Sequence, residues 1–170
     1  MTNEIPGLPT PAHPFITSIS GLSPTYENDY GCAPIQEGST QPWECRASTV
    51  ASNGYHAYIR VGVFNGGSDG SWGWEKAYKF HNMDLQAEIN VIHDGASATQ
   101  GSWYTYELEF AFDGQNQFIA KVVVATTSTA KNSGPSPDGY QVGLYTGYCT
   151  NPSSTVKMPT CPNEVNTYFE

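Results

Sequence analysis

The chain has 170 residues, a net charge of −9 and only seven lysines and arginines, so no overall positive field draws it toward DNA or an anionic membrane. Charged residues make up 14% of the sequence, against roughly 25% in an average soluble protein, while tyrosine and glycine are plentiful. The length fits one domain, and no stretch reaches the roughly 20 apolar residues that span a bilayer. These properties favour a single domain whose surface is polar but largely uncharged.

The N-terminal part of the chain is rich in proline. Residues 1–25 hold five prolines and show little apolar periodicity, which indicates an extended arm or linker. Residues 26–170 are then expected to form one disulfide-stapled domain.

The four cysteines occur as two local pairs, Cys32 with Cys45 and Cys149 with Cys161. Three pairings are possible, and we expect the local one because each bridge then closes a short loop at small entropic cost. Each bridge would add about 2–4 kcal/mol to stability and would need an oxidising compartment. The chain is therefore predicted to be secreted or extracellular.

Apolar periodicity predicts one strand and two short helices in the first half of the domain. Residues 55–64 alternate with a period of two, as in a strand. Residues 72–81 have apolar positions at helical spacing, and a second helix is expected to begin at Asp84, a good N-cap, and to stop at Asp94-Gly95.

Three further strands are predicted over residues 103–112, 118–126 and 140–149. The resulting order predicts an α+β fold, with one or two short helices packed on a mainly antiparallel β-sheet and with two disulfides. Glu107 and Glu109 share one face of the 103–112 strand, and we interpret them as solvent-facing acids on an edge strand rather than as a glycosidase pair.

The densest group of reactive side chains lies on the first predicted helix. Lys76, Lys79 and His81 bring two cations and an imidazole close together in a chain that has only seven cations. An imidazole can exchange a proton near neutral pH, and ammonium groups can hold a phosphate. Metal-free cleavage of a phosphodiester requires both, so this helix is the first candidate for chemistry.

Two short motifs resemble secreted bacterial toxin ribonucleases of the barnase, EndoU and colicin group. The segment Gly73-Trp74-Glu75-Lys76-Ala77-Tyr78-Lys79-Phe80-His81 is similar to their Gly-aromatic-x-basic-Ile-x-x-basic-His helix. Gly143-Leu144-Tyr145-Thr146-Gly147-Tyr148 is similar to the last strand of the four-stranded sheet that follows that helix. The resemblance covers residues 73–148 and departs from the pattern at Ala77 and Phe80.

The resemblance implies a metal-independent endoribonuclease that cleaves RNA by 2′-hydroxyl attack, with no cofactor and with an immunity or inhibitor protein as a partner. His81 would be the principal base or acid, Lys76 the second basic residue, and Thr146 and Tyr148 would offer hydroxyls to the phosphate. The implied substrate-binding residues are Lys79, Trp74 and Tyr145.

Two other interpretations stay open. The first helix would serve only to pack the core if its histidine were hydrogen-bonded inside and its lysines faced solvent. A carbohydrate-binding domain without catalysis is the other alternative, because exposed aromatic rings stack on sugars. Its binding platform would be formed by Trp43, Trp72, Trp103 and Tyr104. The sequence carries no metal-binding motif, so no metal is predicted.

Overall fold

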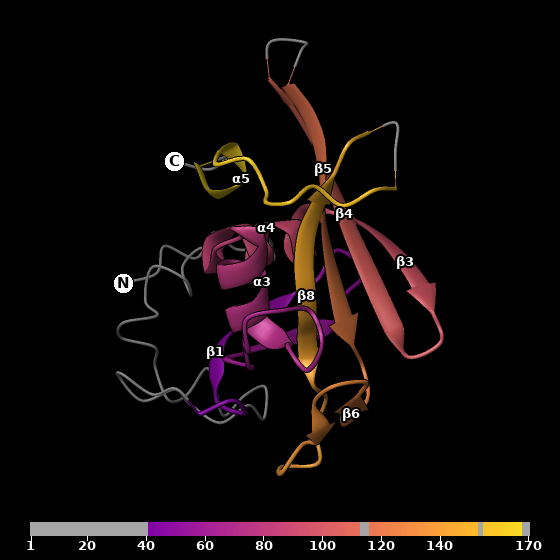
Figure 1. The fold of residues 1–170 in the computed structure, drawn as a ribbon. Coiled ribbons are helices and arrows are strands. Elements are labelled where there is room, and N and C mark those ends of the chain that lie inside the picture. The colour runs from indigo at the N-terminus through magenta and orange to yellow at the C-terminus, as the bar shows by residue number, and fades with distance from the viewer. Residues whose placement is uncertain (1–40, 113–115, 153–154, 168–170) are drawn as a thin grey trace, which may run out of the picture.

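The computed structural model of the chain describes residues 41–112, 116–152 and 155–167. The elements in chain order are β1 (Cys45–Val50), β2 (His56–Arg60), α3 (Gly73–His81), α4 (Leu85–Asp94), β3 (Ala96–Gln100), β4 (Trp103–Phe112), β5 (Asn116–Ala125), β6 (Thr129–Ala130), β7 (Gly134–Pro135), β8 (Gly143–Thr150) and α5 (Glu164–Thr167). Helices therefore combine with antiparallel sheets, and the predicted α+β class is confirmed (Figure 1). The predicted arm, residues 1–25, lies outside the described residues.

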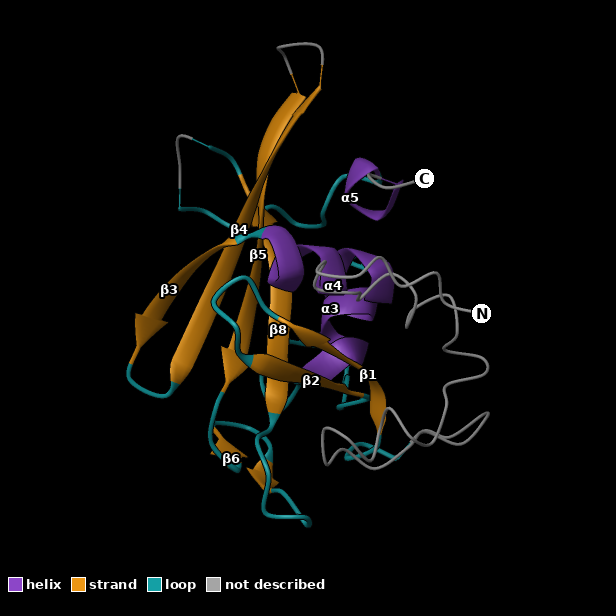
Figure 2. Cartoon of the chain, turned by 180° about the vertical axis from the view of Figure 1, so that it is seen from behind, coloured by secondary structure: helices purple, strands orange, loops and turns teal. Residues whose placement is uncertain are grey.

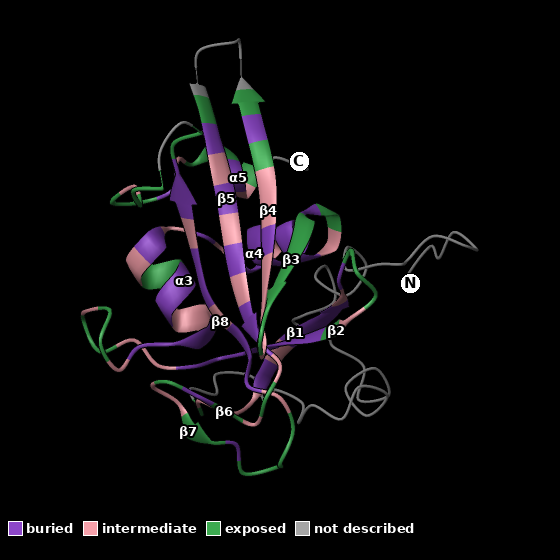
Figure 3. Ribbon diagram, turned by 90° about the vertical axis from the view of Figure 1, so that its right-hand side faces the viewer, coloured by how far each residue is buried: buried purple, intermediate pink, exposed green. Residues whose placement is uncertain are grey.

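The main sheet has four antiparallel strands in the order β3-β4-β5-β8. α4 packs behind β4 and β5, and α3 lies alongside β8 (Figure 3). The side chains that alternate toward α4 form the core because a half-buried strand buries every second residue. They include Tyr106, Phe110, Phe118, Ala120, Val122, Val124 and Leu144.

The opposite face of this sheet is only partly covered. Glu107 of β4, Lys121 of β5 and Tyr148 of β8 face one another in register across three strands. The Lys121 ammonium lies 2.8 Å from the Glu107 carboxylate. β4 lies between β3 and β5, so the interpretation of Glu107 as an acid on an edge strand is wrong. The missed edge strand is β3, whose five residues are all exposed.

A smaller sheet of β1 and β2 crosses the lower end of β8 (Figure 2). Gly143, the first residue of β8, has a positive φ of 80°. A Cβ atom at this position would collide with the backbone carbonyl of Tyr58 in β2. Glycine is therefore needed here for the close approach of the two sheets.

The helices begin and end almost where the apolar pattern predicts. Asp84 caps α4, and its carboxylate accepts a hydrogen bond of 2.9 Å from the backbone N–H of Ala87. α3 ends at Asn82, a left-handed residue with φ of 57°. Neither these helices nor any other described helix is long and apolar enough to cross a membrane.

One of the two predicted disulfides is observed. Cys149 at the end of β8 is bonded to Cys161, which confirms the local pairing for this half of the chain. Cys45 is buried in β1, but Cys32 lies outside the described residues, so the Cys32–Cys45 bridge stays a prediction. The backbone N–H of Cys161 donates to the carbonyl of His81 at 2.8 Å, so the bridge also ties the C-terminal segment to the end of α3.

Candidate functional site

α3 packs closely against β8 because the contact point on the strand is a glycine. A Cβ atom at Gly147 would lie 2.7 Å from Sδ of Met83 and 3.5 Å from Cβ of Ala77. This close approach carries Lys76 and His81 of the same helix to the strand, where both side chains are 4% exposed. The sequence motif on the helix and the motif on the strand are therefore neighbours in space.

A β-bulge in β8 adds a side chain to this contact. Val123 pairs with Thr146 and Val124 with Leu144, so Tyr145 is the extra residue of the bulge. The Tyr145 ring lies 5.2 Å from the ring of Trp103, and its hydroxyl accepts a 2.7 Å hydrogen bond from Asn132. Lys76 Nζ lies 5.0 Å from the centre of the Tyr145 ring. The bulge therefore directs Tyr145 toward a buried ammonium group.

Tyr148 connects His81 with a lysine from the C-terminal segment. The rings of His81 and Tyr148 are 6.1 Å apart, and Lys157 Nζ lies 4.3 Å above the Tyr148 ring. Lys157 reaches this position because its segment turns back and forms a β-bridge with Thr150. Lys131 follows β6 and precedes Asn132, the donor to Tyr145, and it is close enough to Lys76 to lower its pKa. We call this group the β8 cation site; its members are Lys76, His81, Lys131 and Lys157, with Tyr145, Thr146 and Tyr148 of β8.

The lysines of the β8 cation site differ from the other lysines in their partners. Lys79 is paired with Glu75, and Lys121 with Glu107. Within residues 41–112, 116–152 and 155–167, no carboxylate lies at ion-pair distance from the three lysines of the site, Lys76, Lys131 and Lys157. The three lysines of the site therefore have no paired carboxylate among the described residues, although the chain as a whole is strongly acidic.

Burial and neighbouring cations lower the pKa values at the site. The pKa of Lys76 lies below its ordinary value, because burial and Lys157 disfavour the charged form; Asp69 acts in the opposite direction. Burial, with Lys157 and Lys76, lowers the pKa of His81 to about 4. The imidazole is therefore neutral at pH 7 and has a lone pair to accept a proton.

Several polar atoms of the site are buried without a partner. Neither ring nitrogen of His81 forms a hydrogen bond with any described residue, and the same holds for the Thr146 hydroxyl. Nearly all buried polar groups in folded proteins are hydrogen-bonded, so a group of unpartnered ones needs an explanation. Together with the unpaired lysines, they form a set of groups that can bind an anion with hydroxyl substituents.

The structure brings together five of the seven residues implied by the resemblance: His81, Lys76, Thr146, Tyr148 and Tyr145. The remaining two lie elsewhere on α3. Trp74 stacks on Tyr78 at 5.3 Å and carries the Arg46 guanidinium at 4.2 Å, while the Lys79 side chain is 49% exposed beside Glu75.

Two further cations of the site, Lys131 and Lys157, were missed in the sequence. No motif surrounds them, and they follow the end of α3 by at least 50 positions along the chain. Composition alone could have indicated them: lysines are scarce in this chain, so each lysine with no acidic residue nearby in the sequence is a candidate for an anion site.

The four aromatic residues considered for a sugar platform do not form one surface. Trp72 is only 2% exposed, and Tyr104 packs edge-on against Tyr55 at 4.9 Å. Trp103 packs against Tyr145, and Trp43 lies 4.7 Å from Trp72. A carbohydrate site would therefore need a different arrangement from a row of coplanar rings.

Among the described residues, no group of three or more histidine, cysteine, aspartate or glutamate side chains is placed to hold a metal ion. Comparisons of the sequence with protein-family models and curated proteins, and of the fold with solved structures, found no match. The geometry of the β8 cation site is therefore the basis for inferring a function.

Proposed function

We propose that the β8 cation site binds the phosphodiester backbone of RNA and cleaves it by metal-independent attack of a 2′-hydroxyl on the adjacent phosphorus. The observation that carries this proposal is that Lys76 and Lys157 lie close to a neutral imidazole, with Lys131 close to Lys76, and that none of the three has a carboxylate at ion-pair distance among the described residues. Like charges held close together repel one another, and a bound phosphate would relieve that repulsion. The short resemblance in residues 73–148 points to the same chemistry.

The proposed reaction uses a neutral imidazole as the base and a lysine of lowered pKa as the acid. A neutral His81 takes the proton of the 2′-hydroxyl as the bond from the 2′-oxygen to phosphorus forms. The bond from phosphorus to the 5′-oxygen breaks, and Lys76 gives its proton to that leaving oxygen. A lysine whose pKa is lowered is a better acid than an ordinary lysine. The products are a 2′,3′-cyclic phosphate and a free 5′-hydroxyl, and the proton on His81 then returns to Lys76 through water.

The site has a buried floor and an exposed rim. Lys76, His81 and Thr146 form the floor, while Lys131 and Lys157 are exposed. A phosphate would meet the rim lysines first, and the half-buried Tyr148 with Lys157 would move aside for the 2′-hydroxyl to reach His81. Ammonium groups at the rim also give RNA a local attraction that the overall charge of −9 does not provide.

Secretion and an inhibitor partner belong to the same proposal. The Cys149–Cys161 bridge suits an oxidising compartment. A protein that masks the β8 cation site would be expected to present carboxylates to Lys131 and Lys157, because both are exposed.

The direct test is incubation of micromolar protein with single-stranded RNA in EDTA, with mass spectrometry to detect 2′,3′-cyclic phosphate ends. We expect cleavage by the wild-type chain and a loss of about 10²-fold or more in His81→Ala. His93→Ala is the matched control, because His93 lies on α4 beside Asp94 and outside the site. Intact RNA with the wild type, or equal rates for wild type and His81→Ala, would refute the proposal.

If His81 has only a structural role, its replacement is expected to change stability and not RNA cleavage. If the imidazole only packs the contact between α3 and β8, His81→Ala lowers stability and leaves RNA cleavage and RNA binding as they are. Measuring thermal unfolding alongside RNA cleavage distinguishes a structural from a catalytic role of His81. The same pair of measurements on Lys76→Met, with Lys79→Met as the control outside the site, distinguishes the two roles for Lys76.

A further inference from the structure

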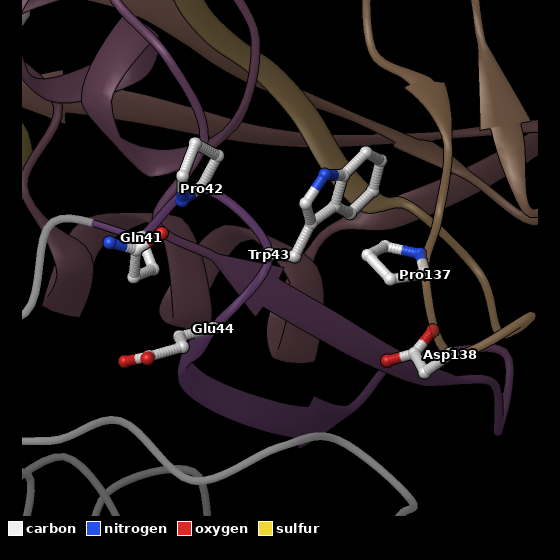
Figure 4. Close-up of a pocket in the computed structure, with 6 residues that line it drawn as sticks. All are labelled: Gln41, Pro42, Trp43, Glu44, Pro137 and Asp138. Carbon is white, nitrogen blue, oxygen red and sulfur yellow. The ribbon is translucent and has the colours of Figure 1, made fainter.

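Two surfaces outside the β8 cation site differ in how far the fold already occupies them. The first is a hollow lined by Gln41, Pro42, Trp43, Glu44, Pro137 and Asp138 (Figure 4). Its aromatic ring and one of its carboxylates are engaged inside the fold, because the guanidinium carbon of Arg60 lies 5.4 Å from the Trp43 ring and Arg60 pairs with Asp138. The second is the outer edge of β3, which pairs with no described strand on that side.

β3 (Ala96–Gln100) is the open margin of the main sheet. It is the first strand in the order β3-β4-β5-β8, and all five of its residues are exposed. Figure 1 shows it at the margin of the sheet, and Figure 3 draws it in the colour of exposed residues. At the other margin, Lys157 forms a β-bridge with Thr150, and β2 lies against the start of β8 at Gly143. Of the two margins, β3 is therefore the one at which the described residues leave room for another strand.

The hairpin of β3 and β4 determines which backbone groups of β3 point outward. Gln100 pairs with Trp103 across a two-residue turn, so these two residues form a hydrogen-bonded pair. Hydrogen-bonded and non-hydrogen-bonded pairs alternate along an antiparallel ladder, so every second residue of β3 bonds to β4. Ser97 and Thr99 are the residues in between, and their N–H and C=O groups therefore point away from β4.

β3 has none of the features by which edge strands usually avoid pairing. Its sequence, Ala-Ser-Ala-Thr-Gln, contains no proline and no charged residue, and its register with β4 runs without a bulge. Natural proteins generally protect an exposed edge with charge, proline, a bulge or a covering segment. An unprotected edge of this kind is typical of a site of strand addition.

We infer that β3 pairs with β3 of a second copy of the chain, in an antiparallel arrangement centred on Ala98. In this register Ser97 of one copy lies opposite Thr99 of the other, and the two residues bond through the groups that point outward. A two-fold axis repeats this pair on its other side and joins two four-stranded sheets into one. β8 is the strand farthest from β3, so the contact covers neither of the two β8 cation sites.

The side chains of β3 suit its own copy. Ala98 would lie opposite Ala98 of the other copy, where small side chains allow the strands to approach closely. Ala96 would lie opposite Gln100 of the other copy, so no charged residue of β3 meets a like charge in the new ladder. The nearest acid of β4, Glu107, lies opposite Ala96 and is paired with Lys121 of its own copy at 2.8 Å.

The length of β3 indicates a weak dimer. A strand of five residues is about 17 Å long, and its contact is smaller than the roughly 1,200–2,000 Å² buried in stable interfaces. We expect a dissociation constant of about 0.1–1 mM. Each copy carries a net charge of −9, so salt should strengthen the association by screening the repulsion between copies.

The test is sedimentation equilibrium of the full chain between about 10 µM and about 1 mM in about 0.3 M salt. We expect the average mass to rise toward that of a dimer. Ala98→Asp and Ala98→Lys should each weaken association about tenfold or more, because like charges then lie directly opposite each other. An equimolar mixture of the two variants should regain it through opposite charges. Gln117→Asp is the matched control, since Gln117 is exposed on β5 and lies outside the contact.

A second pair of variants tests the backbone. Thr99→Pro removes an outward N–H without removing a bond to β4 and should abolish association, whereas Thr99→Val keeps that N–H and should associate as the wild type does. Three results would overturn the inference: a wild type that stays monomeric at about 1 mM, equal association of wild type and Ala98→Asp, and a mixture of the Ala98 variants that associates no better than either alone. These measurements involve no RNA, so this inference and the proposed function fail independently.

Discussion

Arg60 and Lys76 are both buried cations, with 0% and 4% of their surface exposed, yet their surroundings are opposite. Arg60 donates to the carbonyls of Trp43 and Gln141 and pairs with Asp138. Lys76 has an aromatic ring beside it, and burial, followed by Lys157 and Lys131, lowers its pKa. A buried charge that the fold neutralises supports the fold, whereas one that the fold leaves unpaired is better suited to a ligand.

Removing the paired charge should have the largest effect. Arg60→Met is expected to lower the free energy of unfolding by about 3–5 kcal/mol, because it leaves the Asp138 carboxylate without its cation and two backbone carbonyls without their donor. Urea unfolding measures the loss. Arg60→Lys should recover only part of it, since an ammonium group cannot reproduce the fork of hydrogen bonds. A loss below about 1 kcal/mol would mean that the paired Arg60 stabilises the fold no more than the unpaired Lys76 is expected to do.

The buried imidazole predicts a loss of stability in acid. The pKa of His81 is about 4 in the folded chain and about 6.5 when unfolded, so the unfolded state takes up the proton first. Stability should be complete above about pH 6.5 and should fall by up to about 3 kcal/mol as the pH decreases to 4. Chemical unfolding between these values, compared with His81→Leu, measures the effect. An identical slope in both proteins would contradict the burial of a neutral ring.

Glu88 of α4 predicts a pH dependence of the opposite sign. It is fully buried, and burial, with Asp84, raises its pKa well above the ordinary value while Arg46 opposes the shift. The folded chain therefore keeps the proton longer than the unfolded chain, and stability should decrease as the pH rises above about 4.5. Glu88→Gln should be more stable than wild type by about 1–2 kcal/mol at pH 7. Equal stability at pH 7 would count against this view of the carboxyl group.

The smallest change in stability is expected at the unpaired charge. Lys76→Met should change the free energy of unfolding by less than about 1 kcal/mol, because it removes a desolvated charge and its repulsion by Lys157. RNA affinity, measured by fluorescence anisotropy, should nevertheless decrease about tenfold. Lys79→Met is the matched control and should alter neither quantity appreciably, since an exposed pair with Glu75 contributes only about 0.3–0.5 kcal/mol. A similar loss of affinity in both variants would mean that RNA binding depends on the net charge of the chain and not on the β8 cation site.

Elements with a strong periodic pattern were predictable. The alternation of residues 103–112 and the capping aspartate at Asp84 are local signals, and β4 and α4 follow them closely. β1 and β3 were missed. β3 has five small or polar residues that are all exposed, so no apolar alternation marks it, and its place in the sheet depends entirely on pairing with β4.

The candidate site divides in the same way. Lys76, His81, Tyr145 and Tyr148 could be selected from two short motifs, although their mutual distances could not be known. A bulge in β8 placed Tyr145 beside Lys76, and a chain reversal closed by a disulfide brought in Lys157, which no motif marked. Both features depend on how strands are registered, and register is set by partners far away in the chain.

The sequence by itself determined which segments form helices and strands, because periodicity and capping act over a few positions. Its composition determined which reactive groups are scarce. The three-dimensional arrangement decided which charges are neutralised. The sequence places Glu75 next to Lys76 and no acid next to Arg60, yet packing pairs Arg60 with Asp138 and brings further lysines to Lys76. Electrostatic interaction depends on distance through space and on burial, and neither quantity is written in the local sequence.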